Sequence, residues 1–225
     1  MITYFEGTVF NSGAEAFVNT VNTVGVMGAG IALEFALRYP DMFDDYKYKC
    51  DNKMLTVGKV DYYQADKIIV NFPTKWHFKY PSQESWIEDG LKDFVETYKQ
   101  YEFKSVAFPR LGCANGGLSW DRIKPLMEKY LSNLDVNVII CLDSLGYAEG
   151  KEKEMVEKFN KTSIEELMQN VKLNVKQREA LEMIKPIDRF WKIQKVKGLG
   201  ITTYTKIFNL FYDDKFQPNA QISLF

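Results

Sequence analysis

Two glycine-rich segments have the residue types and the spacing of a ligand-binding site. Glycines are concentrated in residues 25–30 and again in residues 112–117, and each segment lies between a predicted strand and a predicted helix. Glycine lets a backbone approach a pyrophosphate closely, and successive amides at a helix start attract phosphate oxygens. Either segment alone could be an ordinary strand–helix turn. Together they favour a site for a phosphate-containing ligand.

Lys75 is the candidate for nucleophilic chemistry. It follows the apolar run at residues 68–72 and Pro73, so we expect it in a connector just after a strand. A lysine whose pKa is lowered by burial or a cationic neighbour can attack a sugar carbon as a neutral amine. The alternative is an ordinary solvated surface lysine.

Other reactive or aromatic residues near these segments allow two interpretations each. His77 could act as an acid or base near neutral pH, or it could simply be packed and hydrogen-bonded. Trp76 and Phe78 could stack on a base of a nucleic-acid strand, or they could belong to the core. Cys113 has no neighbour in sequence that would activate it, so we interpret it as a small residue of the second segment.

The elements that must position these residues alternate between strands and helices. Apolar runs predict strands near residues 17–21, 68–72, 105–108 and 136–142, and periodic patterns predict helices near 30–39, 82–101 and 120–133. This order predicts an α/β fold whose mostly parallel mixed sheet is flanked by helices. Ligands bind such sheets beyond the carboxyl ends of the strands, which is where both glycine-rich segments fall.

The sequence changes character after Gly146. A charged stretch at residues 150–154 is typical of a boundary, and the following pattern predicts a small all-helical domain. Ser163 and Glu166 fit a capping box. Helices are expected near residues 152–160, 163–171, 175–185 and 187–196. We therefore expect one domain over residues 1–147 and a second over residues 148–225.

Bulk properties narrow the function classes. The 225 residues carry a formal net charge of −1, so any contact with DNA would have to be local. Three scattered cysteines and a single histidine exclude a conventional zinc site and indicate free thiols in a reducing compartment. There is no apolar run of transmembrane length and no signal-peptide pattern. We expect a soluble cytoplasmic protein without a metal or cofactor, and no membrane partner.

Both glycine-rich segments resemble ligand loops of the macrodomain family. Residues 18–22 with 25–32 are similar to the first loop, and residues 109–112 with 115–118 to the second, pyrophosphate-holding loop. Residues 38–40 and 71–75 resemble one branch of the family. That branch is the DNA ADP-ribosyl glycohydrolase antitoxins, which counteract DNA-modifying ADP-ribosyltransferase toxins. The resemblance covers about two thirds of the chain.

The resemblance implies a ligand, a reaction and a set of residues. Lys75 would be catalytic, removing ADP-ribose from a modified DNA base, with thymidine favoured and guanosine the alternative. Asn22 would lie at the distal ribose, and other residues would line the ribose–phosphate edge and the pyrophosphate. The expected ligand-binding residues are Asn22, Gly28, Ala29, Gly30, Ile31, Thr74, Gly112, Cys113, Ala114, Asn115 and Gly116.

Two departures from the family pattern bear on specificity. Many macrodomains have an adenine-binding aspartate near Thr8, which this sequence lacks. A related lysine-using enzyme that acts on proteins has an aspartate where this chain has Gly116, which favours the DNA-directed branch. Two other functions remain open: a reader module that binds ADP-ribose without cleaving it, and a hydrolase of a free ADP-ribose derivative.

Two segments of the C-terminal region resemble interaction elements. Residues 196–207 are similar to a helix-hairpin-helix element, in which Lys197, Gly198, Gly200 and Lys206 would contact DNA phosphate. The alternative is a plain packing turn at Gly200. The last residues, 221–225, resemble the short peptide with which bacterial proteins bind the sliding clamp, although an apolar tail can also fold back and pack.

Overall fold

Continuous apolar runs form the centre of the sheet, because strands buried on both faces lack polar alternation. In the computed structural model, which describes residues 1–213, four such strands lie side by side in parallel. They are β6 (Asn137–Cys141), β5 (Ser105–Pro109), β2 (Ala16–Val21) and β4 (Ile68–Pro73). The predicted parallel sheet is confirmed.

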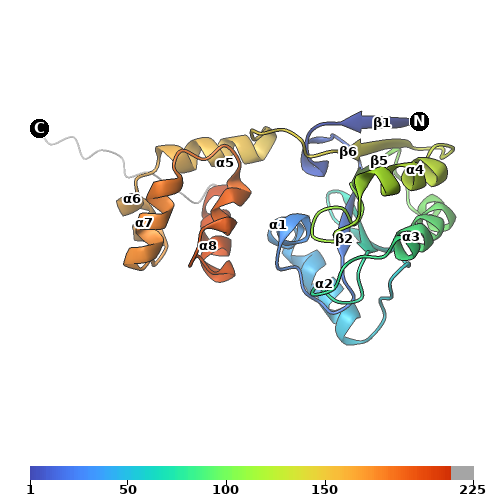
Figure 1. Ribbon diagram of the computed structural model, residues 1–225, viewed down its shortest axis with the longest axis horizontal. Coiled ribbons are helices and arrows are strands. Elements are labelled where there is room, and N and C mark those ends of the chain that lie inside the picture. Colours follow the sequence, from blue (N-terminus) through green and yellow to red (C-terminus); the bar gives the residue numbers. More distant parts are fainter. Residues whose placement is uncertain (214–225) are drawn as a thin grey trace, which may run out of the picture. The chain divides into compact units, whose positions relative to one another are not determined.

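Two short edge strands were not expected from the sequence. β1 (Ile2–Phe5) pairs in parallel with β6, and β3 (Asp61–Gln64) pairs antiparallel with β4. The six-stranded order is β1-β6-β5-β2-β4-β3, so the sheet is mixed (Figure 1). Both edge strands have four residues, too few for a clear hydrophobic pattern.

Helices cover both faces of the sheet. On one face, α3 (Glu84–Thr97) and α4 (Trp120–Leu131) pack Ile87 and Met127 into one core cluster. The other cluster includes Phe35 of α1 (Gly30–Arg38) and Met42 of α2 (Pro40–Asp51). Short 3₁₀ turns, η1 (Val9–Asn11) and η2 (Tyr98–Gln100), complete this unit. The sequence pattern predicts α1, α3 and α4 but not α2.

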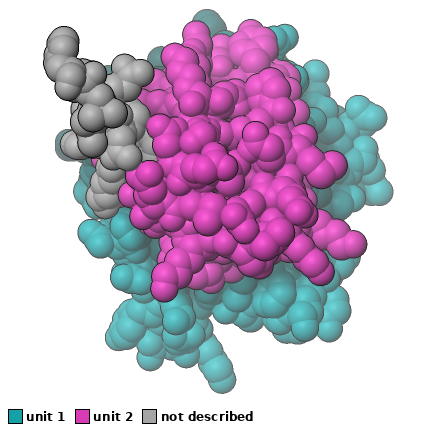
Figure 2. Space-filling view, turned by 90° about the vertical axis from the view of Figure 1, so that its left-hand side faces the viewer, with its two compact units in different colours: residues 1–144 teal, residues 145–225 magenta. Residues whose placement is uncertain are grey.

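The chain divides into two compact units, residues 1–144 and residues 145–225 (Figure 2). The boundary predicted from the sequence lies after residue 147. The second unit contains α5 (Gly150–Lys161), α6 (Ile164–Asn170), α7 (Val175–Ile184), η3 (Phe190–Lys195) and α8 (Ile201–Tyr212). The capping box at Ser163 is confirmed, and Asn174 with Gln177 forms another.

A cluster of aromatic rings forms the core of the second unit. Phe159, Phe190 and Phe211 meet with ring centroids 5.7–6.0 Å apart. The α-helix expected at residues 187–196 is instead the six-residue 3₁₀ helix η3, whose start is held because the Phe190 amide donates to Glu152 at 2.8 Å. Across residues 1–213, none of the helices combines the length and apolarity needed to cross a membrane.

Candidate functional site

Three neighbouring strands end at the same edge of the sheet and carry the candidate residues there. β5, β2 and β4 are adjacent and parallel, so the connectors after them emerge side by side. These are loop 1 (residues 22–29), the arm (residues 74–83) and loop 2 (residues 110–119). The two loops lead into α1 and α4, while the arm leads into α3.

Asn22 fixes the shape of loop 1 from inside. Its side-chain Oδ1 accepts from the amides of Val24 (3.0 Å) and Val26 (3.4 Å), and its Nδ2 donates to Val26 O at 2.6 Å. The Tyr46 hydroxyl of α2 donates to Asn22 O at 2.8 Å, and burial raises the pKa of Tyr46, so the phenol stays protonated. The Asn22 side chain therefore fixes the conformation of loop 1.

Loop 1 ends in exposed backbone at the start of a helix. Gly28, Ala29 and Gly30 are exposed. The cap position of α1 is Ala29, which provides no side-chain hydrogen bond, and the first turn of α1 contains no acidic residue. The first-turn amides of such a helix are left for another acceptor, and the helix dipole favours a negative one. This arrangement suits a phosphate group.

Loop 2 closes tightly on itself, which explains its glycines. The Leu118 amide donates to Gly112 O at 3.0 Å, and Gly112 has a φ of +68°. A Cβ on Gly116 would lie 2.2 Å from Gly112 O and 2.5 Å from Ser82 Oγ, which leaves no room for any side chain. Ala114 and Asn115 form the exposed crest of the loop.

The two loops approach each other at Gly30 and Asn115. A Cβ on Gly30, whose φ is +59°, would lie 2.7 Å from the Asn115 side-chain nitrogen. The predicted ligand residues of the two loops are thus brought to one place. Ile31 is the second residue of α1, while Thr74 is buried and its amide continues the β2–β4 pairing by donating to Val21 O at 2.9 Å.

Lys75 lies at this meeting point. Its half-buried amine donates a hydrogen bond to Asn115 O of loop 2. Burial lowers the pKa of Lys75, which enlarges the neutral fraction of the amine. Lys75 is therefore held against loop 2 and is not an ordinary solvated lysine.

The aromatic residues that follow Lys75 do not lie in the core, which was one of the two interpretations from sequence. Trp76, Phe78 and Tyr80 are 48%, 44% and 51% exposed. His77 is packed instead: its ring stacks on Phe78 at 4.4 Å, and its Nδ1 accepts from the Lys79 amide at 3.2 Å. These contacts favour a structural role for His77 over proton transfer.

Cys113 behaves as a small residue of loop 2. Its Sγ lies 3.4 Å from Leu111 O, and burial raises the pKa of the thiol despite the opposing charge of Arg110. A raised pKa keeps the thiol protonated and unreactive. This agrees with the interpretation from sequence.

Sequence reasoning missed the residues that support the loops from beneath. Tyr46 anchors loop 1, and the Ser82 amide anchors loop 2 by donating to Gly116 O at 2.9 Å. Asn19 and Asn71 form a buried side-chain pair at 3.1 Å across β2 and β4. Asn residues inside two apolar strands were the available signal for this pair, whereas nothing in the sequence distinguished Tyr46 or Ser82.

In the second unit, the four residues proposed to contact DNA lie around one turn. Lys197 and Lys206 are exposed, Gly198 has a φ of +86°, and Gly200 is the cap residue of α8. The Gln177 side chain donates to Gly198 O at 3.0 Å. The turn joins the 3₁₀ helix η3 to the α-helix α8.

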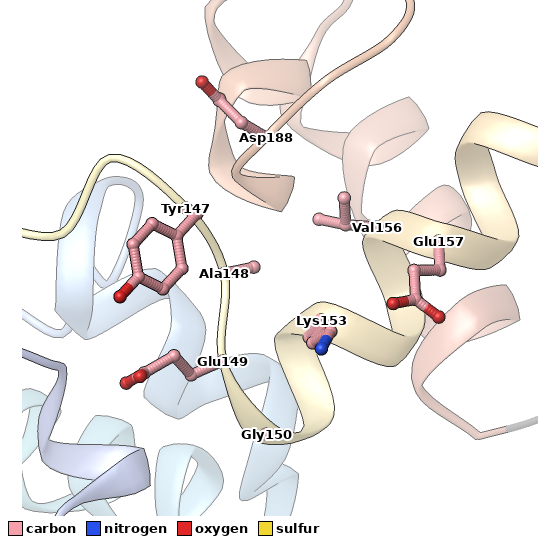
Figure 3. Close-up of a pocket in the computed structure, with 8 residues that line it drawn as sticks. All are labelled: Tyr147, Ala148, Glu149, Gly150, Lys153, Val156, Glu157 and Asp188. Carbon is pink, nitrogen blue, oxygen red and sulfur yellow. The ribbon is translucent and has the colours of Figure 1, made fainter.

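A separate cavity of about 500 Å³ lies at the start of α5 (Figure 3). Its lining includes one cation and three carboxylates. No glycine loop of the first unit contributes to it, and it differs in chemistry from the site at the sheet edge. Its lining residues are Tyr147, Ala148, Glu149, Gly150, Lys153, Val156, Glu157 and Asp188.

Comparison with known proteins identifies the first unit. Residues 18–127 match the Macro domain family model. The solved macrodomain of Mycobacterium tuberculosis DarG is 43% identical, with a TM-score of 0.60, and the match covers 63% of this chain and 97% of that one. The chain belongs to the macrodomain family. Another similar structure, Thermosipho africanus DarTG in complex with ADP-ribose, is 38% identical with a TM-score of 0.60, covering 63% of this chain and 41% of that one.

Curated relatives of this macrodomain protein carry an enzymatic name. A Mycobacterium tuberculosis DNA ADP-ribosyl glycohydrolase is 44% identical over 152 residues, which are 65% of this chain and 43% of the relative. A Thermosipho africanus DNA ADP-ribosyl transferase–DNA ADP-ribosyl glycohydrolase fusion protein is 36% identical over 157 residues, 61% of this chain and 40% of the fusion. The chain thus spans about two fifths of the length of these relatives.

Proposed function

We propose that this macrodomain protein removes ADP-ribose from a modified DNA base. The Lys75 amine carries the proposal, because it lies against Asn115 O where loop 1 and loop 2 meet. The names of the curated relatives support the reaction. The solved DarTG complex supports ADP-ribose as the product that the site holds.

In this proposal the ligand lies along the two loops. The exposed residues 28–30 and the start of α1, with Ile31, face one phosphate, and residues 112–116 wrap the pyrophosphate. Thr74 and Asn22 hold the backbone around the distal ribose, whose anomeric carbon then faces Lys75. The Asn22 side chain acts by shaping loop 1, since both its amide nitrogen and its Oδ1 bond to loop 1 backbone.

The chemistry follows from a neutral amine at a sugar carbon. The Lys75 lone pair forms a bond to the anomeric carbon while the bond to the base breaks. The base leaves with the electron pair of the broken bond and takes up the proton that the alkylated amine loses. Water then attacks the same carbon, which releases ADP-ribose and frees the amine. Desolvation favours this route because it reduces the protonated fraction of the amine.

The decisive test separates this enzyme from a reader module. Lys75→Ala should abolish release of ADP-ribose from modified DNA and leave the Kd for ADP-ribose within a few-fold, because the amine acts in the transition state. Calorimetric titration measures binding, and release from a labelled oligonucleotide measures activity. Full activity in the variant contradicts the mechanism, and an inactive wild type that binds ADP-ribose favours the reader.

A cognate ADP-ribosyltransferase toxin is the proposed biological partner, with this protein as its antitoxin. The fusion of both activities in the Thermosipho africanus relative supports this pairing. Free Cys50, Cys113 and Cys141 support work in a reducing, cytoplasmic compartment. Co-expression tests the proposal: the wild type, but not Lys75→Ala, should relieve the growth arrest caused by such a toxin.

Contact with the sliding clamp is a further proposed partnership. The peptide at residues 221–225 lies outside the described residues, so the proposal rests on the sequence alone. A pull-down with purified clamp should lose its signal in the Leu224→Ala/Phe225→Ala variant. Absence of binding by the wild type would contradict it.

A further inference from the structure

The arm is tied to both glycine loops near its two ends. At its start, the Lys75 amine donates to Asn115 O of loop 2, and the Thr23 hydroxyl of loop 1 donates to Trp76 O at 2.8 Å. At its end, the Ser82 amide donates to Gly116 O at 2.9 Å. The backbone of residues 75–82 is therefore held in place beside the reacting end of the site.

Between these anchors the arm presents aromatic rings to solvent. Trp76 and Tyr80 stack on each other at 5.2 Å with an interplanar angle of 13°, and both are about half exposed. Phe78 is 44% exposed, with the Lys79 ammonium 5.9 Å from its ring centroid. Such rings are usually buried, so three of them on one short arm indicate a binding surface.

The charge of the arm indicates the kind of partner. The arm, residues 74–83, contains no acidic residue, and Lys79 lies beside the Phe78 ring. Flat rings beside a cation suit an unpaired nucleic-acid strand, whose bases have π faces and whose backbone is anionic. A base inside a duplex is not reachable for chemistry at its edge, so a single strand also suits the reaction.

We propose that Trp76, Phe78 and Tyr80 form an aromatic platform that stacks on an unpaired base next to the ADP-ribosylated one. This rests on the proposed function and makes single-stranded DNA the substrate class. The anchored backbone holds the arm in place before a strand binds, which reduces the ordering cost of stacking. The glycine loops recognise ADP-ribose, and the platform recognises the strand that carries it.

Two measurements on the full chain test the platform. The first compares kcat/KM for a single-stranded oligonucleotide carrying one ADP-ribosylated thymidine with kcat/KM for the ADP-ribosylated mononucleotide. Trp76→Ala and Tyr80→Ala should each lower the oligonucleotide-to-mononucleotide ratio by about 5- to 150-fold, since a mononucleotide has no neighbouring base to stack. The second is the affinity for an unmodified labelled oligonucleotide, by fluorescence anisotropy with ADP-ribose present, which should fall in the same variants.

Tyr48→Ala is the matched control, because Tyr48 is a 63% exposed tyrosine on α2 and outside the arm. It should leave the ratio and the affinity unchanged. Equal ratios in wild type and platform variants, or equal loss in Tyr48→Ala, would overturn the platform. If the wild type cleaves neither substrate, the proposed function fails, and the anisotropy measurement decides the platform on its own: affinity unchanged by Trp76→Ala and Tyr80→Ala overturns it.

Discussion

At the level of single residues, the proposed mechanism makes reactivity depend on the neutral fraction of the Lys75 amine. Burial is what lowers its pKa, and the bond to Asn115 O holds the amine in place. Only the neutral amine is nucleophilic, so activity is lost as the pH falls below the Lys75 pKa and gained as the pH rises through it.

We therefore expect kcat/KM to rise with pH along a single ionisation, with a midpoint below the usual lysine value of about 10.4. A pH–rate profile on modified DNA measures this, and Lys75→Arg should show no such rise because its charge is fixed. A rate that falls as the pH rises would assign the essential group to an acid instead.

Tyr46 is the residue whose importance is least visible in the sequence. Tyr46→Phe removes the hydroxyl that bonds Asn22 O at 2.8 Å and should cost about 1 kcal/mol of stability. For a chain of this size we expect a Tm lower by about 2–4 °C, and a weaker Kd for ADP-ribose because loop 1 loosens. The exposed Tyr48→Phe should change neither quantity in thermal melts and titrations. Unchanged ADP-ribose affinity in Tyr46→Phe would show that this tyrosine does not support ligand binding.

At the level of elements, the two loops need glycine for opposite reasons. At Gly116 a Cβ would meet backbone at 2.2 Å, whereas at Gly28 it would meet only Val26 at an ordinary 3.6 Å. Gly116→Ala should thus lower both Tm and ADP-ribose affinity. Gly28→Ala should keep the wild-type Tm and lose affinity alone, since its methyl group occupies ligand space. Thermal melts measure the change in Tm, and calorimetry measures the change in ADP-ribose affinity. Full affinity in Gly28→Ala would show that loop 1 does not contact the ligand.

Which elements could be predicted from sequence depended on their pattern. β2 and β4 were predictable because all but one of their residues are buried, which leaves an apolar run. β3 was not, since Asp61–Gln64 is only partly buried and its pairing is set by β4. The two loops were also predictable, because their glycines are adjacent in the sequence and indicate a phosphate-binding site. The supporting roles of Tyr46 and Ser82 and the exposure of Trp76 depend on tertiary contacts. A local sequence pattern does not contain that information.

The turn between η3 and α8 is the element of the second unit that we propose to contact DNA. If Lys197 and Lys206 contact DNA phosphates, Lys197→Ala/Lys206→Ala should weaken DNA binding and reduce its salt dependence by roughly one unit of slope per lost contact. Affinity measured over a range of salt concentrations tests this. An unchanged slope would leave the turn as packing between the Gln177 side chain and Gly198 O.

At the level of the whole molecule, each unit has its own core and can be perturbed separately. In the second unit, Arg189 and Glu152 form a buried ion pair at 3.1 Å, and Glu152 also accepts from the Phe190 amide. Arg189→Ala would remove the guanidinium that pairs with the buried Glu152 carboxylate, at a cost of about 3–5 kcal/mol.

Calorimetry of Arg189→Ala should accordingly show the second unit unfolding at lower temperature. ADP-ribose at about one hundred times its Kd should stabilise the first unit by about 2.7 kcal/mol in both wild type and variant. The exposed Lys192→Ala is the control, because its partner Asp188 stays solvated. Loss of ADP-ribose binding in Arg189→Ala would show that the units do not fold independently.

The crowding at Gly116 also constrains how such proteins can diverge. Any side chain there overlaps Gly112 O and Ser82 Oγ. An aspartate at this position, as the resemblance implies for the protein-directed relative, would therefore require loop 2 or its anchor at Ser82 to shift. The backbone of this loop thus admits a side chain at residue 116 only together with changes in its neighbours.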